Sequence, residues 1–206
     1  MKFKGKLIIF DLDGVLINSL PNMKYALANT SYHIKQKISF KKYKKYIGLP
    51  FEKILKELNI KGDYNKIKSI YSNYSLKKIS KLRINKKKLQ ELEKLKKKYF
   101  LAIFTSKDKR RTLKILKRYN IFSMIITSDD VKHGKPSPEG LIKILKKTRI
   151  KKRDSYFVGD TKFDFKAAKA AKINYLHASW GMEKKLKIKR INYLNCISKI
   201  DRILKN

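Results

Sequence analysis

From about residue 98 to residue 176, short apolar runs alternate with helical patterns, and this alternation limits the possible folds more than any other feature. Strands are predicted over residues 101–104, 124–126, 156–158 and 173–176, and the helices between them over residues 108–119, 138–148 and 163–171. Strands that alternate with helices form βαβ units, whose parallel sheet is covered on both faces. With a further apolar strand at residues 6–10, the pattern predicts an α/β protein of three layers, α/β/α.

A long helical segment separates the first strand from the others. Between about residues 21 and 82, apolar residues recur at spacings of three and four, and Gly48-Leu49-Pro50 ends one helix and begins another. Asn85 is predicted to cap the helix that follows. The segment is too long for a simple crossover, so we expect a separate helical cap over residues 18–83 and a core formed by residues 1–17 and 84–206.

The size and cysteine content set further limits. The chain has 206 residues, enough for one domain with a smaller insert, and Cys196 is its one cysteine. A single cysteine cannot form an internal disulfide, which indicates a reducing compartment. No apolar run approaches the roughly 20 residues that a membrane helix needs. We therefore expect a cytoplasmic protein without a membrane partner, either a monomer or a homodimer.

The charge of the chain is strongly positive. Lys and Arg number 54 against 16 Asp and Glu, a formal net charge of +38. Such a charge is typical of proteins that bind nucleic acid or another polyanion. Only 8 of the 54 basic residues are Arg, the residue best suited to bidentate phosphate and base contacts. The lysines are also spread along the whole chain, so drift in an AT-rich genome is the favoured explanation, and nucleic acid stays an alternative partner.

Polar residues follow the predicted strands at the points where each strand ends. They are Asp11 and Asp13 after the first strand, Thr105 and Ser106 after the second, Lys135 beyond the third, and Asp160 with Asp164 after the fourth. Because ligands of parallel α/β sheets bind at the carboxyl ends of the strands, these side chains are expected to meet in one crevice. Each segment alone could be an ordinary turn or cap, for example with Ser137 as an N-cap and Pro138 as the first helical residue. Their joint occurrence favours catalysis.

This set of residue types suits phosphoryl transfer from a monoester. A phosphate dianion repels a carboxylate nucleophile, so a divalent cation and a fixed positive charge must neutralise it. Carboxylate oxygens favour Mg2+. One strand-end carboxylate can attack phosphorus to form an acyl-phosphate, and a second, two residues further on, can protonate the leaving oxygen.

Four segments resemble the motifs of the haloacid dehalogenase (HAD) superfamily of phosphatases. They are residues 10–16 (FDLDGVL), 103–107 (IFTSK), 134–139 (GKPSPE) and 158–164 (VGDTKFD). The resemblance extends over nearly the whole chain and implies a Rossmann-like core with a helical cap inserted after the first motif.

The resemblance also implies a role for each motif residue. Asp11 would be the nucleophile and Asp13 the general acid and base. Thr105 and the Ser106 amide would hold the phosphate, and Lys135 would neutralise it. Mg2+ would be bound by Asp11, the backbone carbonyl of Asp13 and Asp160, while Asp164 would support the metal site or orient Lys135.

Within the superfamily, the chain most resembles the capped subgroup that includes phosphoglycolate phosphatases, pyrophosphatases and β-phosphoglucomutases. Asp13 disfavours dehalogenation, because members that process phosphate keep an acid at this position. Phe51 stands where sugar-phosphate mutases of the subgroup tend to carry Arg, which disfavours a mutase. The prediction is a Mg2+-dependent phosphatase, similar to phosphoglycolate phosphatase, that hydrolyses a small phosphorylated metabolite through a phosphoaspartyl intermediate on Asp11. Alternatives are a sugar-phosphate mutase, a pyrophosphatase, and a protein that binds nucleic acid or removes its terminal phosphate.

Overall fold

The computed structural model describes residues 5–188 and 191–205, and its centre is one parallel β-sheet. The strands are β1 (Leu7–Phe10), β2 (Phe100–Phe104), β3 (Met124–Ile126), β4 (Ser155–Gly159), β5 (Asn174–Ala178) and β6 (Asn192–Leu194). Their order across the sheet is β3-β2-β1-β4-β5-β6, and every neighbouring pair is parallel. β1 therefore lies inside the sheet between β2 and β4, and the chain crosses from one half of the sheet to the other between β3 and β4.

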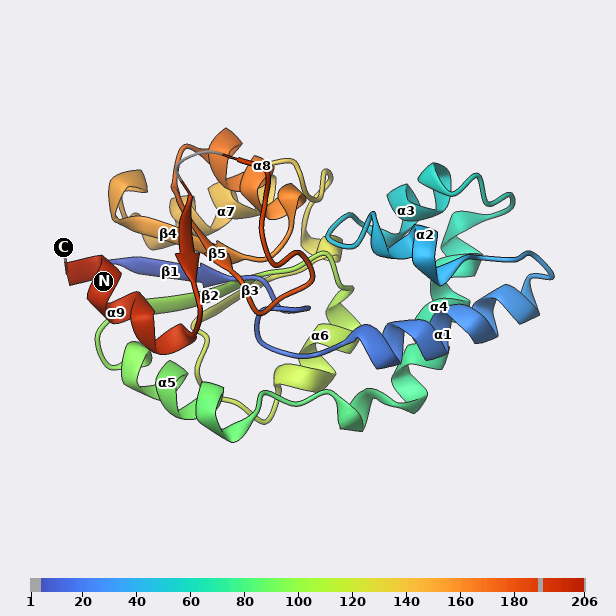
Figure 1. Cartoon of the computed structure of the whole chain (residues 1–206), viewed down its shortest axis with the longest axis horizontal. Coiled ribbons are helices and arrows are strands. Elements are labelled where there is room, and N and C mark those ends of the chain that lie inside the picture. The colour runs from blue at the N-terminus through green and yellow to red at the C-terminus, as the bar shows by residue number, and fades with distance from the viewer. Residues whose placement is uncertain (1–4, 189–190, 206) are drawn as a thin grey trace.

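Helices cover both faces of the sheet. Alternate side chains of β1 contribute to two apolar clusters, one on each face. Ile8 and Phe10 pack with α5 (Lys86–Lys96), α6 (Lys109–Leu116) and α9 (Ile200–Lys205). Leu7 and Ile9 pack with α7 (Glu139–Thr148) and α8 (Lys162–Ala171). Successive strand residues point to opposite faces, so a wholly apolar strand such as β1 requires cover on both sides. Figure 1 shows the resulting three layers, which confirm the predicted α/β fold.

The C-terminal part of the chain differs from the prediction in two respects. The strand at residues 173–176 does not close the series, because β6 extends the sheet beyond β5. β6 lacked a sequence signal because only Leu194 of its residues is buried. The apolar residues Leu194, Ile197 and Ile200 of the C-terminal segment predict a covering helix, but only the end of the segment is one: Leu194 belongs to β6, a 3-10 turn spans Ile197–Lys199, and α9 begins at Ile200.

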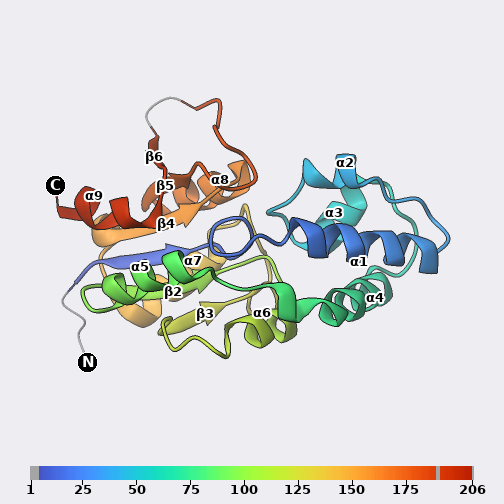
Figure 2. The same cartoon turned by 60° about the horizontal axis from the view of Figure 1, so that its bottom comes forward.

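Residues 20–77 form a separate group of helices, here called the helical unit. Its helices are α1 (Leu20–His33), α2 (Phe40–Lys44), α3 (Phe51–Glu57) and α4 (Tyr64–Lys77), and a short 3-10 turn (Ile79–Lys81) follows them. The unit has its own apolar core, in which Leu27, Leu55 and Tyr71 are buried. Figures 1 and 2 place it beyond the end of the sheet to which β1 and its neighbours point.

Several predicted helix boundaries agree with the structure. The Asn85 side chain accepts a hydrogen bond from the Lys88 amide and caps α5, as predicted, and α3 begins directly after Pro50. The expected cap at Ser137 is displaced by one residue, because Pro138 occupies the N-cap and α7 starts at Glu139. Among the helices of the described residues, none is long and apolar enough to cross a membrane.

Candidate active site

The carboxyl ends of β1, β2 and β4 bring the predicted residues to one place. Asp11 follows β1 directly, Thr105 follows β2, and Asp160 follows β4. β1 lies between β2 and β4, and the chain segments that follow these strands diverge at this end of the sheet. The crevice between such segments is the usual ligand site of parallel α/β sheets. Asp11, Thr105 and Asp160 are all buried there.

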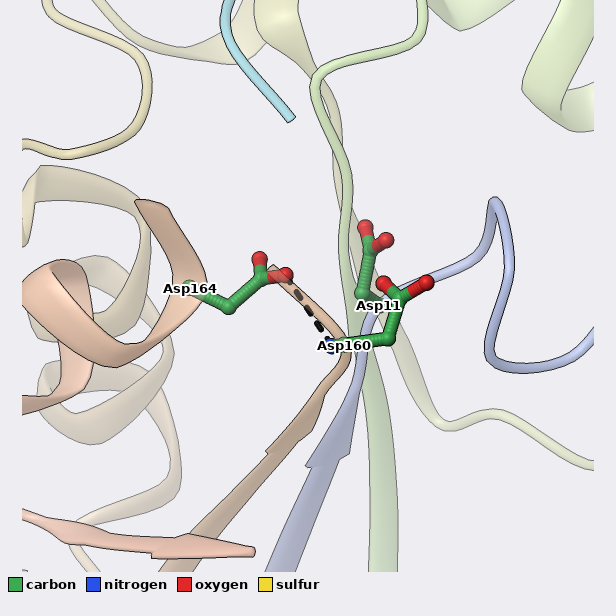
Figure 3. Close-up of side chains that lie close together, drawn as sticks. All are labelled: Asp11, Asp160 and Asp164. Atoms are coloured by element: carbon green, nitrogen blue, oxygen red, sulfur yellow. Dashed lines mark hydrogen bonds between the residues drawn. The ribbon is translucent and has the colours of Figure 1, made fainter. Parts of the chain in front are cut away.

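Three carboxylates form an acidic cluster at this end of the sheet. One oxygen each of Asp11, Asp160 and Asp164 lies within 4.8 Å of the other two, and all three side chains are buried (Figure 3). Asp164 belongs to the first turn of α8, where its Oδ2 accepts from the amides of Asp160 and Thr161 and from the Thr161 hydroxyl. This capping box fixes the orientation of Asp164 before any ligand binds.

Lys135 connects two members of the acidic cluster. Its Nζ lies 2.7 Å from Oδ1 of Asp11 and 2.7 Å from Oδ1 of Asp164, and the side chain is fully buried. Phe104 and Phe157 flank the ammonium at 5.1 Å from each ring centroid. A buried lysine is costly unless it is paired, so the two carboxylates are what keep this charge in place.

Burial and the mutual proximity of these groups shift their pKa values. Burial is the main cause that raises the pKa of Asp11 to about 7; Lys135 opposes this effect, and the charges of Asp164 and Asp13 add to it. Burial and the charges of Asp164 and Asp11 raise the pKa of Asp160 well above its ordinary value. Burial acts to lower the pKa of Lys135, but Asp11 and Asp164 outweigh it, so that pKa is raised.

The acidic cluster fits a divalent cation with oxygen ligands. Oδ1 of Asp160 and Oδ1 of Asp164 are buried and accept no hydrogen bond from the described residues, although the second faces Lys135. Uncompensated carboxylate oxygens are expensive inside a protein, and a cation beside them removes that cost. Gly14 keeps the space open: its φ is +90°, and a Cβ at this position would collide with the Asp160 carboxylate.

Asp13 lies in the loop after β1, two residues beyond Asp11. It forms an ion pair with Lys107, a residue to which the sequence analysis gave no role. Oδ1 of Asp13 is 3.1 Å from Nζ of Lys107, and both side chains are almost fully buried. Burial lowers the pKa of Lys107, an effect that the charge of Asp13 opposes. The Lys107 amide donates to Oγ1 of Thr105, which holds the β2 end of the site together.

Ser106 links the core to the helical unit. Its hydroxyl donates to the carbonyl of Gly48 at 2.6 Å, between α2 and α3. Above it lies a cavity of about 40 Å³, lined on the core side by Asp11, Asp13, Thr105 and Ser106. Asp11 therefore belongs to both groups of predicted residues, the acidic cluster with Lys135 and the wall of the cavity.

Among the further residues that line this cavity are two tyrosines and an arginine that sequence reasoning did not assign to the site. They are Tyr43 and Tyr71 of the helical unit and Arg111 of α6. Tyr43 also packs within the helical unit, where its ring contacts Phe51. For Arg111 a signal existed: it precedes Ile115 by four residues and so lies on the buried stripe of α6. A charged residue on such a stripe is rarely buried without a partner.

The acidic cluster lies where a parallel α/β sheet binds ligands and beneath a separate helical unit, a combination typical of an enzyme that acts on an enclosed small substrate. The family described as haloacid dehalogenase-like hydrolase matches residues 8–178 of the chain. The chain belongs to this family, and the resemblance inferred from the four motifs is confirmed.

Named relatives of the chain are phosphatases. A phosphoglycolate phosphatase from Pseudomonas fluorescens (strain Pf0-1) is 26% identical over 190 residues, covering 85% of this chain and 70% of that protein. A pyrophosphatase, PpaX, from Bacillus mycoides (strain KBAB4) is 29% identical over 187 residues, covering 85% of this chain and 84% of the other. The prediction of a hydrolase of the phosphatase class agrees with these names.

The fold is also that of solved structures. A crystal structure from Lactobacillus plantarum, provisionally assigned as a phosphoglycolate phosphatase, superposes with a TM-score of 0.88 over 98% of this chain and 100% of that one. The two sequences are 21% identical, so this similarity establishes the fold alone.

Proposed function

We propose that this protein is a Mg2+-dependent phosphatase that hydrolyses a small phosphorylated metabolite through a phosphoaspartyl intermediate on Asp11. The observation that carries the proposal is the position of Asp11, whose carboxylate faces Lys135, Asp160 and Asp164 at the carboxyl end of β1. We further propose that residues 18–83 act as a cap over this site.

Mg2+ would be held by Asp11, Asp160 and the backbone carbonyl of Asp13. When bound, it neutralises negative charge on the phosphoryl group and on the carboxylates around it. Asp164 has a different task in this proposal. Its Oδ2 is occupied by the capping box and its Oδ1 faces Lys135, which supports an orienting role toward the lysine.

In the first half of the reaction, a carboxylate oxygen of Asp11 forms a bond to phosphorus, and the bond from phosphorus to the leaving oxygen breaks. The leaving oxygen keeps the electron pair of that bond and takes a proton from Asp13. In the second half, Asp13 removes a proton from a water molecule, whose oxygen bonds to phosphorus. The bond between phosphorus and Asp11 then breaks, which restores the carboxylate and releases phosphate.

The remaining residues hold the phosphoryl group. Thr105 and the amide of Ser106 donate hydrogen bonds to its oxygens, and Lys135 offsets its charge. The Ser106 hydroxyl contacts Gly48 of the helical unit. Closure of the helical unit is therefore linked to ordering of the loop of Thr105 and Ser106 that holds the phosphate.

Phe51 favours hydrolysis over transfer to a sugar phosphate. Its ring stacks on Tyr71 at a centroid distance of 4.3 Å and lines the cavity. Unlike arginine, an aromatic ring at this position offers no positive charge to a second phosphoryl group, so the cations of this cavity are Lys107 and Arg111 of the core.

The test is phosphate release from a panel of phosphomonoesters and pyrophosphate, with and without Mg2+, by the wild type and by Asp11→Asn. We expect release that requires Mg2+ and is absent in the variant. A short incubation with a good substrate, followed by acid quench and mass spectrometry, should find one phosphoryl group on the peptide that contains Asp11. Substantial turnover by a folded Asp11→Asn protein contradicts the proposed nucleophile.

A further inference from the structure

The loop between β1 and α1, residues 11–19, is here called the β1 loop, and one of its carbonyls accepts hydrogen bonds from two side chains that the proposed mechanism does not use. Nζ of Lys88 donates to the carbonyl of Val15 at 2.6 Å, and Nε1 of Trp180 donates to the same oxygen at 2.8 Å. Lys88 belongs to the first turn of α5, and Trp180 lies two residues beyond β5. The β1 loop is thus held by two elements that are distant from it in sequence.

The β1 loop makes a tight turn around Val15. The Gly14 amide donates to the carbonyl of Ile17 at 2.8 Å, and two further amides of the turn donate to the carbonyl of Leu12 at 3.0 and 3.1 Å. Val15 is fully buried. A constraint on its carbonyl therefore acts on the backbone of the whole turn. That backbone includes Asp13, the proposed general acid, whose carbonyl is proposed to bind Mg2+.

The segment that begins at Trp180 also contacts Asp160. The Met182 amide donates to Oδ2 of Asp160 at 2.5 Å, and a Cβ at Gly181 would collide with the same carboxylate. Trp180 and Met182 are two residues apart, so one short segment touches both the β1 loop and Asp160. It sets the separation between two of the groups that are proposed to hold Mg2+.

The position of Lys88 in its helix does not favour a cation. Lys88 is the third residue of α5, where the positive end of the helix dipole opposes a positive charge. The side chain is half-buried, and its Nζ lies 5.3 Å from the centre of the Trp180 ring. Lys88 therefore contacts both the acceptor and the other donor. The three groups form one unit, here called the loop anchor: the Lys88 ammonium, the Trp180 indole and the Val15 carbonyl.

The surroundings of Lys88 weaken its charged form. Burial lowers the pKa of Lys88 to about 8, an effect that the charge of Asp160 opposes. Lys87 and Glu91 of α5, and Cys196 beyond β6, line the same cavity of about 370 Å³ beside it. Lys88 is therefore charged at neutral pH and loses its charge as pH rises above about 8. A neutral amine is a weaker donor and has no cation–π attraction to an indole, so the loop anchor should weaken over this range.

We propose that Lys88 is a positioning residue. Together with the indole of Trp180 it holds the carbonyl of Val15, and so keeps the β1 loop in the geometry in which Asp13 acts. This inference rests on the proposed phosphatase function for its effect on turnover, while the anchoring itself is measured without turnover.

The first test uses tryptophan fluorescence. Trp180 is the only tryptophan of the chain, so the emission reports on the loop anchor directly. We expect the emission of the metal-free wild type to change between pH 6.5 and 9.5 with a midpoint near pH 8. The change should be absent in Lys88→Met, which does not titrate, and in Lys88→Arg, which stays charged. Lys87→Met, the loss of an exposed neighbour, is the matched control and should keep the wild-type curve. A wild-type curve in Lys88→Met overturns the proposal.

Hydrogen exchange measures the β1 loop itself. The amides of Gly14, Leu16 and Ile17, which close the turn, should exchange about 10- to 100-fold faster in Lys88→Met at pH 7, the range for loss of a hydrogen bond from a charged group. Lys88→Arg should restore most of the protection. Trp180→Phe keeps an aromatic ring but removes the indole donor, so it should also accelerate exchange. Wild-type protection in both Lys88→Met and Trp180→Phe overturns the loop anchor.

Kinetics with Mg2+ and the substrate that the wild type hydrolyses best connect the loop anchor to turnover. We expect kcat of Lys88→Met to fall about 10- to 100-fold, the cost of a small misplacement of a reacting group. KM should stay nearly unchanged, because Thr105 and Lys135, which are proposed to hold the phosphoryl group, lie outside the β1 loop. Above pH 8, kcat of the wild type should fall relative to that of Lys88→Arg.

The outcomes separate the two proposals. If the wild type releases no phosphate from any substrate but the fluorescence and exchange results hold, the proposed function fails and the loop anchor stands. If the wild type is an active phosphatase and Lys88→Met keeps its kcat despite faster exchange of the β1 loop, the positioning role fails and the phosphatase stands.

Discussion

Nζ of Lys135 lies 2.7 Å from Oδ1 of Asp11, with both side chains buried, although 124 positions separate them in the chain. The pair joins the loop before α7 to the end of β1, and its second contact, with Asp164, extends it to α8. The residue proposed to neutralise the phosphate therefore also offsets part of the negative charge of the acidic cluster when no substrate is bound.

We expect Lys135→Met to destabilise the fold by about 3–5 kcal/mol at pH 7 in the absence of metal, because the change leaves buried carboxylates without their cation. Urea denaturation measures this difference. Lys143→Met, which removes an exposed lysine from α7, is the control and should cost little. If Mg2+ replaces the missing charge, adding it should restore part of the loss; equal midpoints for wild type and Lys135→Met would show that the buried pair contributes nothing net.

The stability of the metal-free protein should depend on pH through Asp11. Its folded pKa, about 7, lies above the ordinary value of 3.8, so between these values the folded state binds more protons than the unfolded state. The contribution of Asp11 is complete below about pH 4 and is lost as pH rises to 7. Between pH 4 and pH 7, the unfolding free energy of the wild type should fall relative to that of Asp11→Asn. A difference between the two proteins that does not change with pH contradicts the raised pKa.

Mg2+ affinity should show the opposite trend. The raised pKa values of Asp11 and Asp160 mean that protons compete with the cation for the same oxygens. We expect affinity to rise with pH by about tenfold per unit for each proton that the cation displaces, and the contribution of Asp11 to this rise to be complete above pH 7. Calorimetric titration at several pH values tests this. An affinity that is constant between pH 5.5 and 7 would argue against binding by these carboxylates.

Asp13→Ala should separate metal binding from proton transfer. The proposed metal contact of this residue is its backbone carbonyl, so Mg2+ affinity is expected to stay close to that of the wild type. Turnover should fall by about a hundred- to ten-thousand-fold, the usual contribution of a general acid or base. Phosphate release and Mg2+ titration on the same preparation measure both effects. Loss of Mg2+ affinity would place the side chain of Asp13 in the metal site.

Lys172 provides a stability prediction away from the site. It ends α8 in the left-handed conformation, with φ 58° and ψ 44°, a region that residues with a side chain rarely adopt. Glycine adopts this conformation without steric cost, so Lys172→Gly should stabilise the protein by about 0.5–1 kcal/mol. Lys169→Gly, inside α8, is the matched control and should destabilise by about 1 kcal/mol. A lower urea midpoint for Lys172→Gly would contradict the strain at this helix end.

Local patterns in the sequence determined most of the sheet and the set of candidate site residues. A strand and the polar residue after it are adjacent in the chain, and parallel strands end at one edge, so Asp11, Thr105 and Asp160 could be placed together without coordinates. The same reasoning missed β6, whose single buried residue leaves no apolar run. Its place in the sheet depends on backbone pairing with β5, which sequence patterning does not encode.

The tertiary structure decided which of the charges are buried and which distant ones meet. Arg111 and Asp108 pair locally, three residues apart at the start of α6, but their burial depends on α4 packing against α6, where the Ser72 hydroxyl of α4 donates to Asp108. The contact between Lys107 and Asp13 likewise depends on how far apart the ends of β1 and β2 come to rest. Such distances follow from the packing of whole elements, and for buried charges a few ångströms change the interaction energy severalfold. The sequence therefore determines the chemistry that is available at this edge of the sheet, while the packing of the helical unit against the core decides which substrate that chemistry can reach.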